Sequence, residues 1–288
     1  MSLEKSAVVT GASTGIGRAI CDALLGAGWR VFGSVRKSAD AARLKAELGE
    51  HFTPLLFDVT DDAAVRQGAL QVETALAGRT LGALVNNAGI AVGGPLRYIP
   101  IEEIERQFDV NVLGAVRATQ AFLPSLGADR RFAGHPGRIV NMSSVAGKIA
   151  SPFLAPYAMS KHALEAFSDS LRRELLPHGI DVVVVGPGSV ATPIWAKADE
   201  INVEQYRQTE YFDMMTRMRD GMQAFGAQGL PPEAIGRLVR DAVEASKPRT
   251  RYAALKNKFM LWTLPNLLPK RMVDAALAKR FGIPQRTE

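Results

Sequence analysis

A tyrosine and a lysine four residues apart are the strongest sign of chemistry in the sequence. Tyr157 and Lys161 follow Pro156, a residue that a helix tolerates at its start, and positions i and i+4 share one helix face. A tyrosine ionises with a pKa of about 10, too high for a proton carrier near neutral pH. A lysine one turn away and the positive end of the helix dipole both lower that pKa. The pair predicts a general acid–base, and an ordinary exposed aromatic–lysine pair is the alternative.

A glycine-rich turn follows the first apolar run. Gly11, Gly15 and Gly17 have the spacing G-x-x-x-G-x-G and open a stretch rich in Ala and Leu. Gly11 permits a tight turn, Gly15 lets the backbone approach a pyrophosphate, and Gly17 lets the helix pack against a sheet. The exposed N–H groups of the helix N-terminus then bind the phosphates. The turn indicates dinucleotide binding, and a plain strand–helix turn is the alternative.

Four motifs, taken in order, resemble those of the short-chain dehydrogenase/reductase family. The resemblance covers residues 5–255, and the segments 140–144, 157–161 and 165–168 are similar especially to its hydroxysteroid and retinol dehydrogenase branch. The motifs are Thr10-Gly11-x-x-x-Gly15-Ile16-Gly17, Asn86-Asn87-Ala88-Gly89, Ser144 placed 13 residues before Tyr157-x-x-x-Lys161, and Pro187-Gly188 with Thr192 close behind.

The resemblance implies a role for each catalytic residue. Tyr157 is the general acid–base, which protonates a carbonyl oxygen in reduction or deprotonates an alcohol in oxidation. Ser144 hydrogen-bonds the same oxygen, with Ser143 as the adjacent alternative. Lys161 also holds the nicotinamide ribose, and the hydride belongs to the cofactor. Asn111 anchors a proton-relay water, and a structural asparagine that kinks its helix is the other interpretation.

The resemblance also implies where the nucleotide lies. Asp58 and Val59 follow the third apolar run and are expected at the adenine ring, with an ordinary loop aspartate as the alternative. The ribose next to the adenine lies near residues 86–89, and the nicotinamide carboxamide lies near residues 190–192. The expected cofactor-binding residues are Gly11, Ser13, Gly15, Ile16, Gly17, Arg36, Lys37, Asp58, Val59, Asn86, Ala88, Gly89, Tyr157, Lys161, Pro187, Gly188, Val190 and Thr192.

The choice between NAD and NADP is made where the second apolar run ends. An NAD site usually has an acidic residue there, and an NADP site has an arginine. Val35 occupies the acidic position and Arg36-Lys37 follow it. Arg36 can bond a 2′-phosphate through two donors, and Ser13 adds a hydroxyl. Thr14 stands where many NADP-using relatives have a second basic residue. NADP is the expected cofactor, and NAD or a solvated Arg36-Lys37 loop pair is the alternative.

Apolar runs alternate with helical patterns along the whole chain. Near-continuous apolar runs are typical of strands that a parallel sheet buries on both faces. The alternation predicts one Rossmann-type, doubly wound α/β domain of about seven strands. The runs are residues 6–10, 30–35, 52–57, 83–86, 138–142 and 180–185, with a weaker one at 250–255. The helical stretches lie near 15–28, 61–77, 101–127, 156–177 and 231–246.

Two segments extend this domain of residues 1–255. Residues 193–228 follow Thr192, where the resemblance implies a lid over the substrate. They contain an apolar helix face, which fits such a lid; a buried core helix is the alternative. Methionines on that face suit varied apolar ligands, so the expected substrate is an apolar ketone or alcohol, steroid-, retinoid- or lipid-like. Arg217 and Arg219 leave an acidic substrate open. The face consists of Tyr211, Met215, Met218, Met222 and Phe225.

The second segment, residues 256–288, is an amphipathic, cationic C-terminal extension. The chain has 35 Lys and Arg against 29 Asp and Glu. Ten of the basic residues, and only two of the acidic ones, lie from residue 247 onward. The rest of the chain has no basic excess, which argues against nucleic-acid binding. The extension could contact an anionic membrane surface, a partner subunit or the mouth of the active site.

The composition is that of a folded globular protein. Cys21 is the single cysteine, so no internal disulfide is expected and a reducing, cytoplasmic location is predicted, with peripheral membrane contact as the alternative. The histidines have no ligand-like spacing and predict no metal site. The apolar helices at 101–127 and 156–177 predict a homodimer or homotetramer. A nucleotide-binding regulatory protein without turnover is the alternative function.

Overall fold

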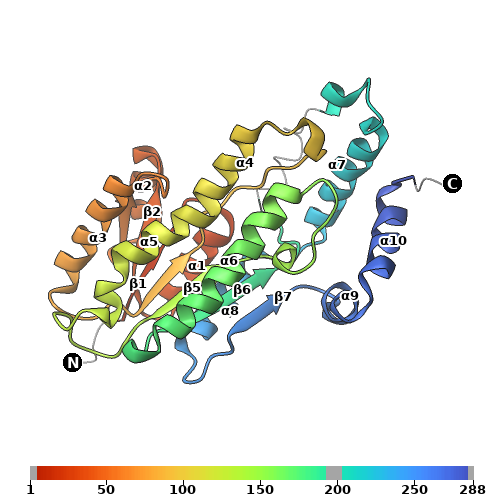
Figure 1. Cartoon of the computed structure of the whole chain (residues 1–288). Coiled ribbons are helices and arrows are strands. Elements are labelled where there is room, and N and C mark those ends of the chain that lie inside the picture. The colour runs from red at the N-terminus through yellow and green to blue at the C-terminus, as the bar shows by residue number, and fades with distance from the viewer. Residues whose placement is uncertain (1–4, 193–202, 285–288) are drawn as a thin grey trace.

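Seven parallel strands form a single sheet in the order β3-β2-β1-β4-β5-β6-β7 (Figure 1). The computed structural model describes residues 5–192 and 203–284. The predicted doubly wound α/β fold is confirmed, and all seven expected strands are present. They are β1 (Ser6–Val9), β2 (Arg30–Val35), β3 (Phe52–Leu56), β4 (Ala83–Asn86), β5 (Arg138–Met142), β6 (Asp181–Pro187) and β7 (Arg251–Ala254).

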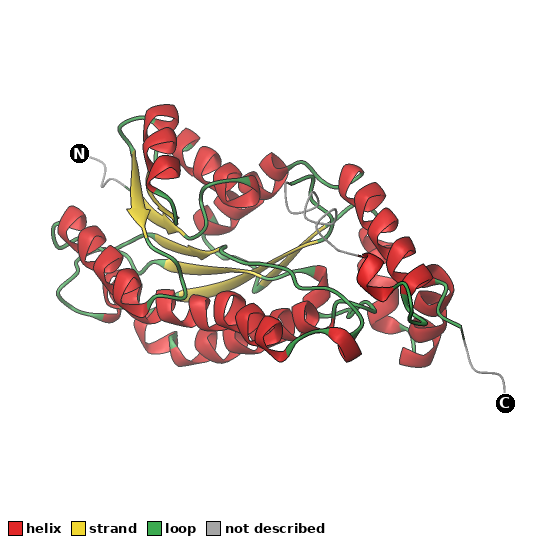
Figure 2. Cartoon of the chain, turned by 90° about the horizontal axis from the view of Figure 1, so that it is seen from above, coloured by secondary structure: helices red, strands yellow, loops and turns green. Residues whose placement is uncertain are grey.

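Helices cover both faces of the sheet (Figure 2). α1 and α8 lie on one face, and α3, α5 and α6 pack on the other. The helices are α1 (Gly15–Gly26), α2 (Ser38–Leu48), α3 (Asp62–Leu76), α4 (Ile101–Phe108), α5 (Gly114–Phe122), α6 (Ala155–Glu174), α7 (Phe212–Ala227), α8 (Pro232–Glu244), α9 (Leu264–Leu267) and α10 (Lys270–Phe281).

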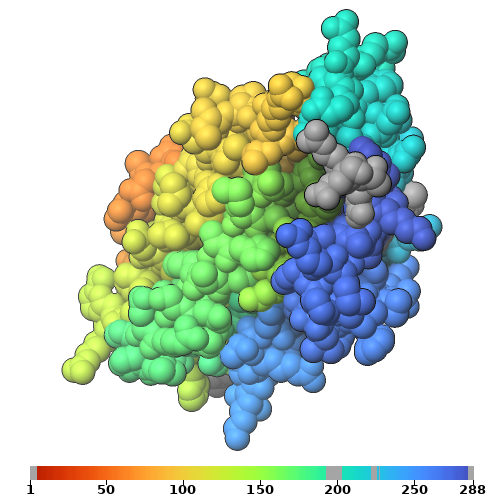
Figure 3. Space-filling view, turned by 45° about the vertical axis from the view of Figure 1, so that its right-hand side comes forward, coloured from red at the N-terminus to blue at the C-terminus, as the bar shows by residue number. Residues whose placement is uncertain are grey.

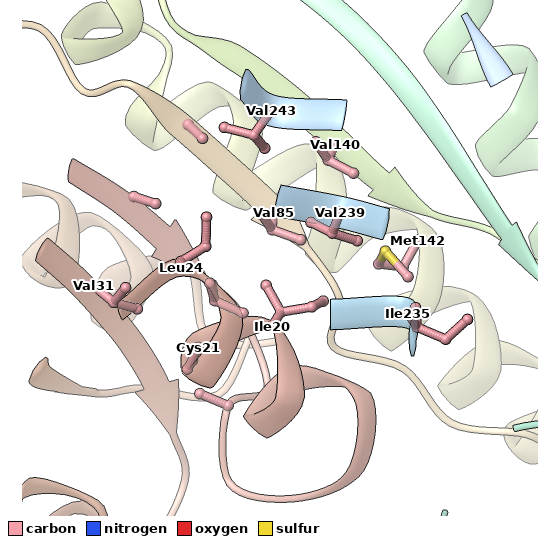
Figure 4. Packing of buried hydrophobic residues seen from close by; sticks show 14 of the residues in the cluster. Ile20, Cys21, Leu24, Val31, Val85, Val140, Met142, Ile235, Val239 and Val243 are labelled. Carbon is pink, nitrogen blue, oxygen red and sulfur yellow. The ribbon is translucent and has the colours of Figure 1, made fainter. Parts of the chain in front are cut away.

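The first helix is held firmly against the sheet and against α8. A Cβ added at Gly236 of α8 would lie 2.3 Å from the backbone oxygen of Ala19, so the two helices meet backbone to backbone. Each fully buried aliphatic side chain here contributes about 1.5–3 kcal/mol. The side chains labelled in Figure 4 are Ile20, Cys21 and Leu24 of α1, Val31, Val85, Val140 and Met142 of the strands, and Ile235, Val239 and Val243 of α8.

The strand order reverses at β1, which pairs with β2 on one side and β4 on the other. In such sheets a ligand binds in the crevice beyond the carboxyl ends of the strands, at the point of reversal. The residues expected to bind nucleotide lie at or after the ends of β1, β2, β3, β4 and β6. Of those expected to catalyse, Ser144, Tyr157 and Lys161 follow β5 and Asn111 follows β4. The topology therefore brings the two sets to one edge of the sheet.

Two helical details differ from the sequence prediction. Helix α2 was not expected, because its pattern is polar: within α2, all of which is described, only Leu44 is buried. The stretch expected as one helix at 101–127 is divided by a π-helical turn at Asp109–Leu113 and ends in a second one at Pro124–Ala128, where Gly127 has a φ of 109°. The first of these turns carries Asn111.

The C-terminal extension is helical and lies against the body of the domain. A π-helical turn at Phe259–Thr263 runs into α9, and α10 follows beside α7 (Figure 1). Figure 3 shows the extension in dark blue, next to the green surface that includes α6. Among the described residues, none of the helices has the length and apolar character needed to cross a membrane.

Candidate active site

The turn between β1 and α1 has the shape that a phosphate needs. Gly11 and Gly15 have φ values of 67° and 56°, which favour glycine, and a Cβ at Gly17 would lie 2.1 Å from the Gly11 oxygen. Thr14, at the N-cap of α1, makes no side-chain capping bond, so the first N–H groups of the helix keep their donor capacity. Together with Ile16, these residues fit the pyrophosphate of a dinucleotide.

Side chains that the sequence analysis had not assigned to the site hold this turn in place. The Thr10 hydroxyl accepts hydrogen bonds from the N–H groups of Asn87 at 2.9 Å and Ala88 at 3.0 Å. The Asn87 amide donates back to the oxygens of Thr10 at 2.9 Å and Gly11 at 3.2 Å. The Gly11 N–H donates to the Ser34 hydroxyl at 3.0 Å. The ends of three strands are thus locked together, with Ala88 beside the turn.

Two expected cofactor residues have their side chains in the interior instead. The Asn86 amide donates to Asn141 at 2.8 Å and to Thr119 at 3.1 Å, and the residue is 4% exposed. Val59 is buried and packs closely against Gly114: a Cβ added at Gly114 would lie 2.6 Å from a methyl group of Val59. These two side chains therefore pack inside the domain, and the expected place of Asn86 at the ribose and of Val59 at the adenine stays a prediction.

The end of β2 agrees with the predicted choice of nucleotide. Val35 is buried, and Arg36, directly after it, is 72% exposed. The Arg36 guanidinium lies 3.8 Å from the carboxylate of Asp58, which follows β3 and also accepts hydrogen bonds from Thr60. An exposed ion pair of this length contributes little to stability, so Arg36 remains available to an incoming anion.

Ser13 and Lys37 both adjoin helix α2, which the sequence pattern did not predict. The Ser13 carbonyl accepts a hydrogen bond from Arg43 of α2 at 3.1 Å, and Lys37 is the exposed residue that precedes this helix. Arg43 also pairs with Asp40 at 3.1 Å. The turn that carries Ser13 is therefore tied to α2, a contact that sequence patterns gave no means of finding.

Ser144, Tyr157 and Lys161 come together as the sequence predicted. Ser144 follows β5, and Tyr157 lies in the first turn of α6 just after Pro156. Ser144 lies near enough to the Tyr157 phenol to act on its pKa. The Lys161 ammonium donates to the Met142 oxygen at 2.8 Å and lies 5.7 Å from the centre of the Tyr157 ring.

The ionisation of the pair differs from the prediction. Burial raises the pKa of Tyr157, and the Ser144 hydrogen bond works in the opposite direction. Burial lowers the pKa of Lys161 to about 8, while Glu165 acts to raise it. The expected lowering of the Tyr157 pKa is wrong, because removing the phenol from water disfavours its charged form. Tyr157 thus keeps its proton near neutral pH and is ready to act as an acid.

The structure separates Ser144 from its alternative, Ser143. The Ser144 hydroxyl accepts from the Ala146 N–H at 3.1 Å, lies 3.4 Å from the Pro187 oxygen and reaches Tyr157. The Ser143 hydroxyl is buried and has no hydrogen-bond partner among the described residues. Of the two serines, Ser144 is the one whose hydroxyl lies near the Tyr157 phenol. This favours Ser144 as the residue that would contact a substrate oxygen.

Asn111 is the centre of the π-helical turn between α4 and α5. Its amide donates to the Ile90 oxygen at 3.0 Å and to the Ser160 hydroxyl at 3.1 Å, and its oxygen accepts from the Ile90 N–H at 2.8 Å. The Ser160 hydroxyl in turn donates to the backbone oxygen of Tyr157 at 2.8 Å. Asn111 therefore lies at a distortion of its helix and is hydrogen-bonded to α6 through Ser160. Its role in anchoring a relay water stays a prediction.

The segment after β6 is held against β7 and against Leu230, and its place at the nicotinamide stays a prediction. The Gly188 N–H donates to the last residue of β7 at 2.8 Å, and a Cβ at Gly188 would lie 2.8 Å from that of Leu255. Val190 is buried and bridges to Leu230. Thr192 is partly exposed and is the last described residue before the gap at 193–202.

Aromatic side chains from distant segments meet over the catalytic end of the sheet. The ring of Phe153, just before α6, lies 6.2 Å from Tyr211 and 6.4 Å from Phe281 of α10. Tyr98 lies 6.0 Å from Tyr206 and from Tyr211. We call Tyr98, Phe153, Tyr206, Tyr211 and Phe281 the aromatic cluster.

The predicted lid helix is present as α7, and part of its apolar face is core. Met215 and Met218 are buried with Val203 and with Tyr206 of the aromatic cluster, and Phe153, Tyr211 and Phe281 of the cluster pack against them. The side chains of Met222 and Phe225, also expected on this face, lie outside the described residues, as do residues 193–202 of the expected lid. The described part of α7 therefore has a buried side, against which Tyr211 packs, and its role as a substrate lid stays a prediction.

Comparison with known proteins agrees with this geometry. The profile of the short chain dehydrogenase family matches residues 5–202. The NADPH-dependent 3-dehydrocapnine reductase of Ornithobacterium rhinotracheale is 40% identical over 273 residues, which cover 95% of this chain and 96% of the relative. Retinol dehydrogenase 5 of Homo sapiens is 33% identical over 286 residues, which cover 93% of this chain and 86% of the relative.

A solved structure resembles the whole chain. A short-chain dehydrogenase from Streptomyces avermitilis superposes with a TM-score of 0.76 at 26% sequence identity, covering 97% of each chain. The fold, the order of the motifs and the relatives' sequences all agree with the resemblance seen in the sequence. The chain belongs to the short-chain dehydrogenase family and is an oxidoreductase.

Proposed function

We propose that the protein interconverts a carbonyl and an alcohol on an apolar substrate with NADP(H). The observation that carries the proposal is that the buried Ser144 and Lys161 lie with the partly buried Tyr157 at the same sheet edge as the glycine turn. A bound nucleotide supplies the hydride for reduction or accepts it in oxidation. The residues that would hold it are those of the turn, with Lys161 at the nicotinamide ribose.

The protein's own groups manage the charge on the substrate oxygen. The Ser144 hydroxyl lies near the Tyr157 phenol, so a carbonyl oxygen placed between them accepts from both hydroxyls. As negative charge develops there, Tyr157 donates its proton and Ser144 stabilises the oxygen. The Lys161 ammonium, 5.7 Å from the ring, stabilises the phenolate that remains. The reverse sequence oxidises an alcohol.

Arg36 supports NADP(H) as the nucleotide. Its exposed guanidinium stands where β2 ends, beside Asp58 and close to the turn. A 2′-phosphate there gains a bidentate partner, while a carboxylate in the position of Val35 would repel it. The 40% identical relative is named as NADPH-dependent, which agrees with this assignment. NAD-dependent oxidation is the alternative.

The aromatic cluster supports an apolar substrate. Tyr211 and Phe153 are partly exposed beside the catalytic end of the sheet, over the buried methionines of α7. Rings and thioethers bind apolar chains and provide little specificity for charge. One of the relatives described above is named as a retinol dehydrogenase. A steroid-, retinoid- or lipid-like ketone or alcohol fits these surroundings.

A nucleotide oxidation assay tests the proposal. The protein is mixed with NADPH or NADH and a panel of ketones and aldehydes that range from acetone-sized to long-chain and polycyclic, and the loss of nucleotide absorbance is followed. We expect turnover with NADPH and the larger apolar carbonyls. Tight nucleotide binding with no turnover of any panel member, in either direction, would contradict the proposal and favour a regulatory protein.

We also propose that the chain forms a homodimer or homotetramer through α4, α5 and α6. Leu113 and Met159 are 48% and 49% exposed on these helices, and Ala166 is exposed on α6. Small exposed residues allow two helices to approach closely, and pairing would steady the helix that carries Tyr157. Light scattering tests this: a mass of two or four chains, lost in Ala166→Arg, is expected, and a persistent mass near 31 kDa would contradict it.

The extension supplies a second proposed contact, with an anionic membrane surface. Phe259, Met260 and Leu267 are 59–76% exposed, and Lys256 and Lys258 are exposed beside them. Apolar side chains flanked by cations are typical of an interfacial helix. We expect co-sedimentation with vesicles that contain anionic lipid, weakened by Leu267→Ser. Equal recovery with and without vesicles would contradict the proposal.

A further inference from the structure

Arg251, at the start of β7, joins the C-terminal extension to the catalytic residues. Its Nε donates to both carboxylate oxygens of Glu165, at 3.0 and 2.9 Å. Its Nη2 donates to the backbone oxygen of Ser144 at 3.1 Å. The ring of Trp262, in the extension, covers the guanidinium at 4.1 Å. The Arg251 side chain therefore contacts Glu165 and Ser144, which lie 86 and 107 residues before it in the chain, and also Trp262 in the extension.

The backbone is shaped to hold these two side chains. A Cβ at Gly186 of β6 would lie 2.4 Å from Nη2 of Arg251, and one at Gly147 would lie 3.1 Å from the Glu165 side chain. Nη1 of Arg251 is buried and has no hydrogen-bond partner among the described residues. The aromatic face of Trp262 is thus the favourable surrounding that the structure offers this part of the cation.

Glu165 connects the same group to Lys161. It lies one turn after Lys161 on α6, its side chain is 6% exposed, and it acts to raise the pKa of the lysine. The charged and titratable groups around Lys161 are Tyr157 and Glu165 on α6, with Arg251 of β7 and Lys148 both paired to Glu165. The backbone oxygen of Met142, in β5, accepts a hydrogen bond from the Lys161 ammonium.

We propose that Arg251 is a positioning residue for the reaction, and that Trp262 of the extension holds it in place. Arg251 fixes the backbone of Ser144 and the carboxylate of Glu165 together, so Ser144 keeps its place beside Tyr157 and Lys161 keeps its charged neighbour. Loss of Trp262 frees the guanidinium and loosens both. The effect on turnover rests on the proposed function, whereas the mechanical coupling does not.

Hydrogen exchange tests the coupling without any substrate. Trp262→Ala is compared with Met272→Ala, a change at an exposed side chain of α10. We expect faster amide exchange in the segment 143–150 in Trp262→Ala, and Trp262→Phe should restore most of the protection because it keeps an aromatic face. Unchanged exchange in Trp262→Ala, or an equal increase in Met272→Ala, would overturn the proposal even if the protein has no activity.

Kinetics on a carbonyl that the wild type reduces provides the second measurement. We expect Trp262→Ala to lower kcat about 3- to 30-fold, the range of a desolvated cation–π contact, and to leave the Kd of the nucleotide within about twofold. Met272→Ala should match the wild type. A loss confined to KM, with kcat unchanged, would overturn the positioning role.

Glu165→Gln gives a signature that a merely structural residue would not. The Glu165 carboxylate favours the charged form of Lys161, so without it Lys161 loses its proton at a lower pH. The alkaline limb of the kcat–pH profile should therefore move down by about one pH unit. An unmoved limb in a folded Glu165→Gln protein would overturn the link. If that variant fails to fold, Trp262→Ala must show the altered exchange and kcat for the proposal to stand.

Discussion

The proposed nucleotide side, at the ends of β1, β2 and β4, and the proposed substrate side, at α7 and α10, are held together by different kinds of contact. At the ends of β1, β2 and β4, backbone groups and short polar side chains are locked by bonds such as those of Thr10 and Asn87. On the other side, α7 and α10 meet Phe153 through rings and methionines, with few polar contacts. The first side can recognise one fixed shape, while the second can accept several apolar ones.

The largest effect that distinguishes the two sides should come from Tyr157, which lies between them. In Tyr157→Phe we expect turnover to fall about 10²- to 10⁴-fold, because no group remains to transfer the proton. The Kd of the nucleotide should stay nearly unchanged, since the phenol acts on the substrate oxygen. Steady-state rates with a parallel nucleotide titration check this, and more than a tenth of the wild-type rate would defeat the assignment.

On the nucleotide side, Arg36→Ala should lower affinity for NADPH by about 1.5–3 kcal/mol, the range for a hydrogen bond to a charged group. Affinity for NADH should hardly change, because NADH has no 2′-phosphate. Isothermal titration with both nucleotides measures the difference. Arg66→Ala, at an exposed arginine of α3, is the matched control for lost positive charge. Equal losses for both nucleotides would show that Arg36 does not contact the 2′-phosphate.

The pH dependence of turnover should report on Lys161. Its pKa is lowered to about 8 by burial, so the ammonium that stabilises the phenolate is lost as pH rises through that value. Reduction should therefore be supported below about pH 8 and decline above it. The measurement is kcat from pH 6 to 10 at saturating substrate and NADPH. A rate that keeps rising to pH 10 would mean that the charge on Lys161 is not required.

The two sides also differ in how far the sequence predicts them. Short-range spacing located Ser144, Tyr157, Lys161 and the glycine turn, because strand ends and one helix turn bring such residues together. It gave no sign that Arg251 reaches Ser144, which is 107 residues away in the chain. That contact depends on the register of β7 beside β6, and no local pattern encodes it.

On the nucleotide side, the sequence leaves side-chain directions and one helix unpredicted. The resemblance places Asn86 near the ribose, and the structure shows its side chain turned inward to Asn141. A strand end alternates its side chains between two directions, so a motif identifies the segment without fixing which member faces the ligand. Helix α2 escaped prediction because Leu44 alone is buried in it, leaving no apolar periodicity to detect.

The smallest expected effect lies on the substrate side, and it should depend on the substrate. Tyr211→Ala removes one ring from contacts with Tyr98 and Phe153, and such ring pairs contribute about 0.5–1.5 kcal/mol. For long-chain or polycyclic carbonyls we expect KM to rise about 2- to 10-fold with kcat and nucleotide affinity unchanged. A small ketone that cannot reach the aromatic cluster is the internal control and should keep its KM. Because Tyr211 packs over the buried Met215 and Met218 without joining the catalytic residues, a fall in kcat for both substrates would mean that the cluster positions α6 and does not bind substrate.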